Sequence, residues 1–345
     1  MAWRLHVHFD AIGLWVFRGA VIGMVVIILA MFGLVFKFQN PVIRIIGIFA
    51  GYMAVFMPYL TFAMAISHIL VMLWDISLFW SGIGAVAAAF IITLIGAILG
   101  NILVIRKTNI AIPNMPKQLR IMQITDVHIG ILYGKKYLAK IVEATNRHNP
   151  DIVVITGDLT ETNGAIKYQM LTPLQNLTVP TYFVPGNHES FPGLAGVLDT
   201  IAAQNVRVLI NEVVETHGIQ LVGLDYMRAD ETAFDMHRID NQKTVKSVLA
   251  KMPLKREIPA IVLSHNPTGV NYAKAAGADL MISGHTHRGQ VFPFSIITKL
   301  AFPYHGGLYE NGGIKVFVSG GAGGVMARMR LGSRNEINLL TLIRQ

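Results

Sequence analysis

Five short segments of this chain carry residue types that bind divalent metal ions. The segments are Asp126-Val127-His128, Gly157-Asp158, Gly186-Asn187-His188-Glu189, Ser264-His265-Asn266 and Gly284-His285-Thr286-His287. Aspartate, asparagine and histidine side chains suit borderline metals such as manganese, iron and zinc. The chain has no cysteine, so thiolate ligands and disulfides are excluded. The segments therefore predict a site that holds two metal ions.

Each segment follows an apolar, β-branched run that is typical of a buried strand. The runs cover residues 119–125, 152–156, 181–185, 260–263 and 280–283. Because ligands bind at the carboxyl ends of the strands in open α/β sheets, we expect the polar segments to meet along one edge. Convergence in space is therefore expected despite the wide separation in sequence.

In order along the chain, the segments resemble the DxH, GD, GNH[D/E], H and GHxH pattern of the calcineurin-like metallophosphoesterase superfamily. Five ordered matches favour this interpretation strongly over a set of unrelated core and turn histidines. The resemblance implies two facing mixed sheets with helices outside, a four-layer α-β-β-α sandwich. Periodicity alone predicts only an α/β or α+β domain.

The resemblance also implies a role for each polar residue. Six residues would each hold one metal: Asp126, His128 and His287 the first, and Asn187, His265 and His285 the second. Asp158 would bridge both metals, and His188 would be catalytic without being a ligand. Two metals about 3.5–4 Å apart clamp a phosphoryl group and generate hydroxide near neutral pH. We expect two divalent ions, with manganese favoured and iron or zinc as alternatives.

The first 108 residues have the composition of a membrane domain. Up to residue 105 the only charged side chains are Arg4, Asp10, Arg18, Lys37, Arg44 and Asp75. At about 20 residues for each spanning helix, we expect four, at about 16–37, 42–59, 61–80 and 83–105. The predicted turns lie at Pro58 and between Trp80 and Gly84. If Pro58 is instead tolerated within one helix, three spans remain.

The basic residues that follow the last predicted span indicate its orientation. They are Arg106, Lys107, Lys117 and Arg120. By the positive-inside rule they place this end of the span, and the domain after it, in the cytoplasm. Lys37 and Arg44 fall on the opposite side and weaken that orientation. A secretory signal peptide is disfavoured because the apolar sequence continues far beyond one short hydrophobic core.

Residues 109–345 are long enough for a single catalytic domain. Helices are expected at 137–145, 195–204, 232–252 and 269–276, and apolar runs at 220–224, 314–319 and 337–343 indicate a second sheet. The segment 291–305 is predicted to be an apolar loop. It either packs against the domain core or the membrane helices, or forms a lipid-facing flap, since exposed apolar surface often marks a contact.

These features predict a membrane-anchored, dimetal-dependent phosphoesterase of the cell membrane. Its expected partners are the lipid bilayer and a phosphorylated, lipid-linked substrate with a phosphoester or pyrophosphate bond. Two alternatives stay open: a phosphodiesterase for a soluble or cyclic nucleotide, and a non-catalytic membrane receptor or scaffold. Nucleic acid is disfavoured because no ladder of aromatic and basic residues is present. The net charge of +9 lies mostly beyond residue 105 and suits anionic headgroups or phosphorylated substrates.

Overall fold

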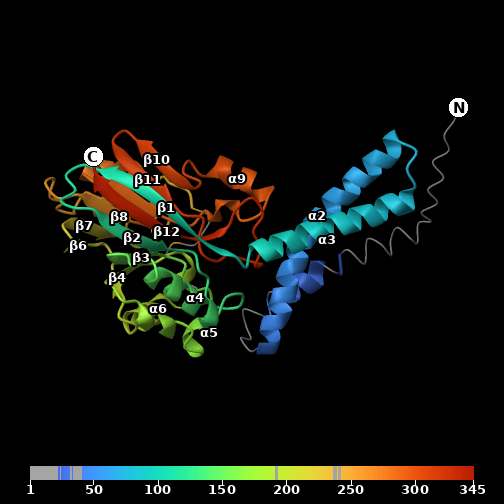
Figure 1. Ribbon diagram of the computed structural model, residues 1–345, viewed down its shortest axis with the longest axis horizontal. Coiled ribbons are helices and arrows are strands. Elements are labelled where there is room, and N and C mark those ends of the chain that lie inside the picture. Colours follow the sequence, from blue (N-terminus) through green and yellow to red (C-terminus); the bar gives the residue numbers. More distant parts are fainter. Residues whose placement is uncertain are drawn as a thin grey trace.

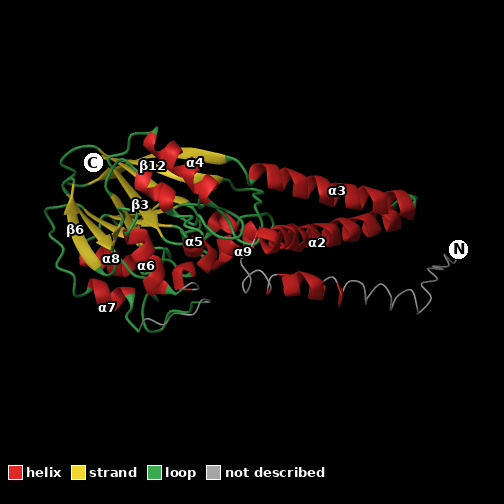
Figure 2. Cartoon of the chain, turned by 90° about the horizontal axis from the view of Figure 1, so that it is seen from below, coloured by secondary structure: helices red, strands yellow, loops and turns green. Residues whose placement is uncertain are grey.

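Two long apolar helices form a hairpin that is joined directly to an α/β domain, as a computed structural model shows (Figures 1 and 2). The structure describes residues 22–23, 25–31, 33, 41–190, 193–235, 239 and 242–345. The hairpin consists of α2 (Pro41–Leu73), a turn at 74–77 and α3 (Leu78–Leu99). By length and apolar composition, both helices could cross a membrane.

The α/β domain contains two six-stranded mixed sheets. The first has the order β1, β12, β2, β3, β4, β5, with bounds β1 (Leu103–Ile112), β12 (Asn335–Arg344), β2 (Leu119–Ile124), β3 (Ile152–Thr156), β4 (Thr181–Val184) and β5 (Arg207–Val208). The second has the order β10, β11, β9, β8, β7, β6, with bounds β10 (Gly307–Asn311), β11 (Ile314–Val318), β9 (Leu280–Ser283), β8 (Ala260–Leu263), β7 (Ile219–Gly223) and β6 (Glu212–Thr216).

Successive side chains of a strand point to opposite faces of its sheet and so belong to two different hydrophobic cores. In β3, Ile152 and Val154 belong to the core between the sheets, where they join Leu221 and Ile282 of the second sheet. The neighbouring Val153 and Ile155 point to the opposite face and join the core beneath the helices. A strand buried on both faces is apolar throughout, which explains the uninterrupted apolar runs of the sequence. The predicted α-β-β-α sandwich is confirmed.

Helices cover the outer faces of both sheets. On the first sheet lie α4 (Lys135–Asn146), α5 (Asn163–Lys167), the 3₁₀ helix η1 (Thr172–Asn176) and α6 (Leu194–Ala202); on the second lie α7 (Val245–Leu249) and α8 (Val270–Ala276). The helices expected at 137–145, 195–204 and 269–276 are therefore confirmed. The helix expected at 232–252 is wrong: in its described part only α7 forms, starting at a capping box between Thr244 and Ser247.

The predicted boundaries of the membrane helices are also wrong. Segments 42–59 and 61–80 are not separate helices, because α2 continues through Pro58 to Leu73. The turn predicted between Trp80 and Gly84 lies within α3. The last predicted span ends early, since residues 103–105 already belong to β1, which pairs in parallel with β12 from Leu103 onward. The α/β domain thus begins at Leu103 and not at 109. The first predicted span, 16–37, lies mostly outside the described residues.

The segment between β11 and β12 packs against the base of the hairpin. Glycines of both helices allow this close approach, because a Cβ atom at Gly51 would lie 1.8 Å from the carbonyl oxygen of Met326. The backbone N–H of Arg330 donates to the carbonyl of Gly96 at 3.0 Å. The side-chain amide of Asn335 donates to the carbonyl of Gly100 at 2.6 Å. The hairpin is therefore held against the α/β domain by backbone contacts as well as by the covalent link.

Candidate metal centre

The five polar segments follow β2, β3, β4, β8 and β9 and meet at one end of the two sheets, as predicted. Asp126, His128 and His287 form one cluster. The Nε2 atoms of His128 and His287 are 3.1 Å apart, and the Nε2 of His287 is 3.3 Å from Oδ1 of Asp126. All three side chains are almost fully buried. This trio is the predicted ligand set of the first metal.

Asp158, His265 and His285 form a second cluster beside the first. The Nε2 of His265 is 3.1 Å from Oδ2 of Asp158 and 3.1 Å from Nδ1 of His285. The same Oδ2 of Asp158 is 3.9 Å from Nε2 of His128 in the first cluster. Asp158 therefore lies between the two clusters, where a bridging carboxylate is expected.

These donors fit a pair of divalent metal ions. Within each trio the candidate ligand atoms lie within 4.8 Å of one another. Asn187, the remaining predicted ligand, is buried, and its side-chain oxygen has no hydrogen-bond partner among the described residues. Buried polar atoms rarely go without a partner, so a cation is the natural partner for this oxygen. Imidazole, carboxylate and amide oxygen together suit Mn²⁺, Fe or Zn²⁺ and do not select one of them.

An unusual backbone aims these side chains. Asp126, His128, Asp158, His285 and His287 all have a positive φ, between 49° and 72°. Residues other than glycine adopt this left-handed conformation infrequently, and it concentrates at functional sites. Because His285 and His287 both have this conformation, their side chains reach separate clusters although they are only two residues apart.

Two glycines, Gly157 and Gly284, leave space for the clusters. Gly157 has a φ of 81°, and a Cβ atom there would lie 2.6 Å from Nδ1 of His265. A Cβ atom at Gly284 would lie 2.3 Å from Oδ2 of Asp126. Larger residues at either position would displace a predicted ligand.

Burial and mutual charge set the protonation states in the protein without metal. Burial raises the pKa of Asp126 to about 6. Burial acts in the same direction on Asp158, but nearby histidines, led by His265, outweigh it and hold the Asp158 pKa well below its usual value. Burial lowers the pKa of His128 and of His287 well below the usual range. At neutral pH these two imidazoles are therefore neutral, which is the form that binds metal.

His188 lies at the rim of the two clusters. It begins the short 3₁₀ helix η2 (His188–Ser190), and its side chain is 18% exposed, whereas that of Asp158 is 3% exposed. Its Nε2 is 3.9 Å from Oδ2 of Asp158, and its ring packs edge-on against that of His128 at 4.6 Å. A histidine at the rim of the candidate ligands and open to solvent can reach a phosphoryl group that binds there. The position suits the predicted catalytic role.

Glu189 and Arg330 support the centre without belonging to the candidate ligand set. The carboxylate of Glu189 accepts hydrogen bonds from the backbone N–H groups of Asp158, Thr160 and Gly186 at 2.7–2.9 Å. Arg330 is fully buried, and its guanidinium donates to the carbonyl of His287 at 2.8 Å. In the sequence Glu189 is part of the GNH[D/E] segment, but nothing in the local pattern distinguishes Arg330 from a surface arginine.

Aromatic side chains line the second cluster. The ring of Tyr226 lies 6.0 Å from His265 and 6.1 Å from His285. The ring of Phe302 packs edge-on against His285 at 5.7 Å. Phe302 directly follows α9 (Phe294–Ala301), which occupies most of the segment predicted to be an apolar loop. The segment is therefore a helix, and it ends beside a predicted metal ligand.

Known proteins are similar in sequence to the α/β domain of this chain. The model of the calcineurin-like phosphoesterase family matches residues 119–289. A metallophosphoesterase of Aquifex aeolicus is 30% identical over 246 residues, which cover 69% of this chain and 91% of that protein. One from Helicobacter pylori is 37% identical over 244 residues, which cover 69% of this chain and 64% of that protein.

A cattle (Bos taurus) protein named "transmembrane protein with metallophosphoesterase domain" is 32% identical over 247 residues. The match covers 67% of this chain and 54% of the bovine protein. The chain thus spans about half of the bovine relative and somewhat under two thirds of the Helicobacter relative.

Proposed function

Because the chain belongs to the calcineurin-like metallophosphoesterase family, we propose that it is a dimetal-dependent phosphoesterase anchored in a membrane by its N-terminal helices. One observation supports the chemistry above all others: two trios of largely buried candidate ligand groups lie side by side with Asp158 between them. Asp126, His128 and His287 would hold one ion. Asn187, His265 and His285 would hold the other.

Two divalent ions at this position would polarise a phosphoryl group and supply a hydroxide nucleophile near neutral pH. The residues of the chain provide the remaining functions. Asp158 fixes the spacing between the two clusters, and Glu189 holds the backbone on either side of Asp158. His188, the one partly exposed imidazole next to both Asp158 and His128, donates a proton to the leaving oxygen or a hydrogen bond to the phosphoryl oxygens.

The hairpin provides the membrane anchor in this proposal. Large apolar side chains such as Phe49, Phe62 and Phe90 are more than half exposed on α2 and α3. Apolar surface of this extent is stable in lipid and unfavourable in water. The name of the bovine relative is consistent with such an anchor. The basic residues after α3 favour a cytoplasmic α/β domain, with the hairpin in the cell membrane.

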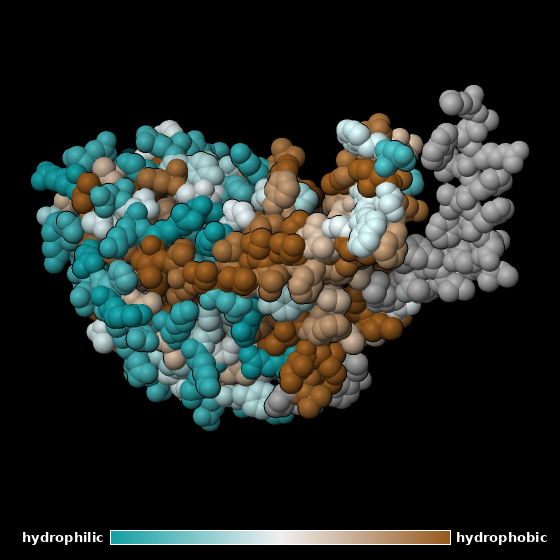
Figure 3. Space-filling view, turned by 45° about the vertical axis from the view of Figure 1, so that its right-hand side comes forward, coloured by the Kyte–Doolittle hydropathy of each residue, from teal (hydrophilic) through white to brown (hydrophobic). Residues whose placement is uncertain are grey.

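The substrate in this proposal is a phosphoester or pyrophosphate of a membrane-associated lipid. α9 supports this choice because it lies on the side of the α/β domain that faces the hairpin (Figures 1 and 2). On α9, Ile297 is 61% exposed and Leu300 is 85% exposed. Figure 3 shows that hydrophobic surface continues from the helices onto the α/β domain. A phosphorylated lipid held at a bilayer could approach the metal centre along this surface.

The proposed reaction can be tested with the full-length protein in nanodiscs. We expect manganese-stimulated hydrolysis of bis-p-nitrophenyl phosphate, and its loss in Asp158→Asn. Asp199→Asn is the matched control, because Asp199 is exposed on α6. Metal content is measured by mass spectrometry in parallel. Wild-type protein that binds no metal would overturn the dimetal proposal. Metal-loaded protein without phosphoesterase activity on any ester would favour a receptor or scaffold, and turnover of cyclic nucleotides alone would exclude a lipid substrate.

A further inference from the structure

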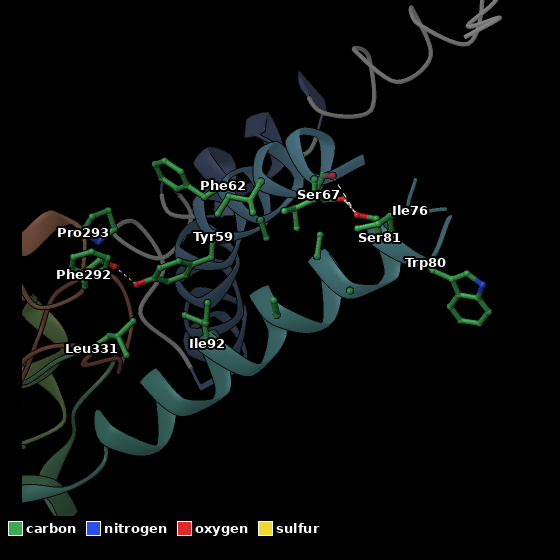
Figure 4. Close-up of a pocket in the computed structure, with 16 residues that line it drawn as sticks. Tyr59, Phe62, Ser67, Ile76, Trp80, Ser81, Ile92, Phe292, Pro293 and Leu331 are labelled. Atoms are coloured by element: carbon green, nitrogen blue, oxygen red, sulfur yellow. Dashed lines mark hydrogen bonds between the residues drawn. The ribbon is translucent and has the colours of Figure 1, made fainter. Parts of the chain in front are cut away.

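A large apolar cavity lies between the two helices of the hairpin and runs from the α/β domain toward the turn at 74–77. Its volume is about 890 Å³, within the range of roughly 300–1,000 Å³ that is typical of ligand pockets. We call it the hairpin slot. It is walled by Phe62 and Ile66 of α2, by Ala88 and Ile92 of α3, and by Phe292 and Leu331 of the α/β domain (Figure 4).

The polar groups of the slot satisfy one another. The hydroxyls of Ser67 and Ser81 are hydrogen-bonded at 2.6 Å, which joins the two helices across the cavity (Figure 4). The hydroxyl of Tyr59 donates to the carbonyl of Phe292, which joins α2 to the α/β domain. The rest of the lining consists mainly of aliphatic and aromatic side chains. An occupant that leaves no buried polar group unpaired here must therefore be apolar.

The domain end of the slot lies close to the metal centre along two routes. Phe292 is five residues after the predicted ligand His287, so the two Cα atoms are at most about 18 Å apart even with a fully extended chain. Leu331 follows Arg330, whose guanidinium donates to the carbonyl of His287 at 2.8 Å. An extended molecule could therefore reach from the slot to the metals.

We propose that the hairpin slot binds an alkyl chain of the substrate while the phosphoryl group of the same molecule lies at the metal centre. This inference rests on the proposed phosphoesterase function and specifies its substrate as a long-chain lipid phosphate. The short reach from Phe292 to His287 favours a chain that continues into a phosphoryl group over a separate apolar partner.

A pair of substrates that differ only in chain length tests the proposal. Hexadecyl p-nitrophenyl phosphate and ethyl p-nitrophenyl phosphate release the same chromophore and present the same reacting group. The slot is filled by Ala88→Phe. The matched control is Ala87→Phe, because Ala87 is also exposed on α3 but does not line the cavity.

For Ala88→Phe, we expect the ratio of kcat/KM for the hexadecyl ester to that for the ethyl ester to fall about tenfold, because the added ring overpacks a slot that holds the alkyl chain. Ala87→Phe should keep the wild-type ratio. An unchanged ratio in Ala88→Phe, or an equal fall in both variants, would overturn the proposal that the slot binds the alkyl chain. If wild-type protein hydrolyses neither ester, the proposed function itself fails, and the two failures are thus distinguished.

A second measurement does not depend on turnover. Because the chain has no cysteine, Ala88→Cys and Ala87→Cys each introduce a single site for a lipid-soluble maleimide. In manganese-loaded protein, hexadecyl phosphate should slow the labelling of residue 88 but not of residue 87. Equal protection by hexadecanol, which lacks the phosphoryl group, would show a general lipid contact and overturn the proposal. A residue 88 that is never labelled would indicate that the chain itself covers the slot, with the same consequence.

Discussion

At the level of single residues, the candidate metal centre combines ordinary ligand side chains with an uncommon backbone conformation. Five of the predicted ligands adopt left-handed conformations that cost free energy for residues other than glycine. Hydrogen bonds from outside the ligand set offset this cost. Glu189 binds three backbone N–H groups around Asp158, and Arg330 binds the carbonyl of His287. Metal sites commonly depend on such supporting residues for their geometry.

The roles of His188 and His285 can be separated by substitution. His188→Ala should lower kcat by roughly 10²- to 10⁴-fold, the usual contribution of a general acid, while metal content stays near the wild-type level. His285→Ala should lose metal as well as activity, because His285 belongs to the second trio. Both quantities are measured on the same preparations by steady-state kinetics and mass spectrometry. Equal loss of metal in the two variants would contradict the assigned roles.

A buried acid outside the ligand set predicts how stability changes with pH. Burial, aided by the charge of Asp158, raises the pKa of Glu161 to about 8. The unfolded chain releases this proton at the ordinary glutamate pKa, so between these two values the folded state binds more protons. Glu161 therefore lowers the stability of the fold progressively as pH rises from about 4.5 toward 8.

Glu161→Gln removes this titration. In metal-free protein, the Tm of the variant relative to wild type should increase between pH 5 and pH 8. Thermal unfolding followed by circular dichroism at several pH values in this range measures the difference. A constant difference across the range would show that Glu161 is ionised in the folded protein.

At the level of elements, the sequence pattern was most informative where one periodicity prevailed. The heptad-like spacing of Leu138, Ile141, Val142 and Thr145 predicted α4, whose buried face contains the same residues. Uniformly apolar segments were harder to divide. Pro58 resembled a boundary but lies inside α2, and residues 103–105 resembled the end of a span but pair with β12. Residues 103–105 form a strand because they pair with β12, which is distant in sequence.

α9 is the element with the most exposed apolar surface in the described part of the α/β domain, and it should act at the membrane. We expect Ile297→Ser combined with Leu300→Ser to leave the Tm and the hydrolysis of soluble aryl esters unchanged, since both side chains are largely exposed. Hydrolysis of a phosphorylated lipid in vesicles should decrease. Ile210→Ser, at a partly exposed position on the α/β domain, is the control. Equal rates in vesicles for all three proteins would leave α9 without a membrane role.

At the level of the whole molecule, the hairpin and the metal centre share one structural segment. The residues between β11 and β12 pack against Gly51 and Gly96 of the helices, and Arg330 within the same segment binds the carbonyl of His287. A displacement of the hairpin should therefore be transmitted to a predicted ligand.

Gly51→Ala tests this connection. The added methyl group would lie 1.8 Å from the carbonyl oxygen of Met326, and such overpacking typically costs about 1–3 kcal/mol. We expect a lower Tm and a lower kcat/KM on aryl esters. Gly82→Ala is the control, because no atom lies within 4 Å of the added group. If the two variants behave alike, the hairpin contact has no influence on the centre.

The sequence by itself determined the candidate ligands of the metal centre, the reaction class they indicate, the sandwich fold implied by the ordered motifs, and the presence of long apolar helices. Each of these depends on residue types and on spacing within a short segment. The tertiary structure decided the rest: the left-handed backbone that aims the candidate ligands, the hydrogen bonds of Glu189 and Arg330, the pairing of residues 103–105 with β12, and the slot between the helices. These features depend on contacts between residues far apart in the chain. The free energies of such contacts cannot be read from the propensities of a short segment.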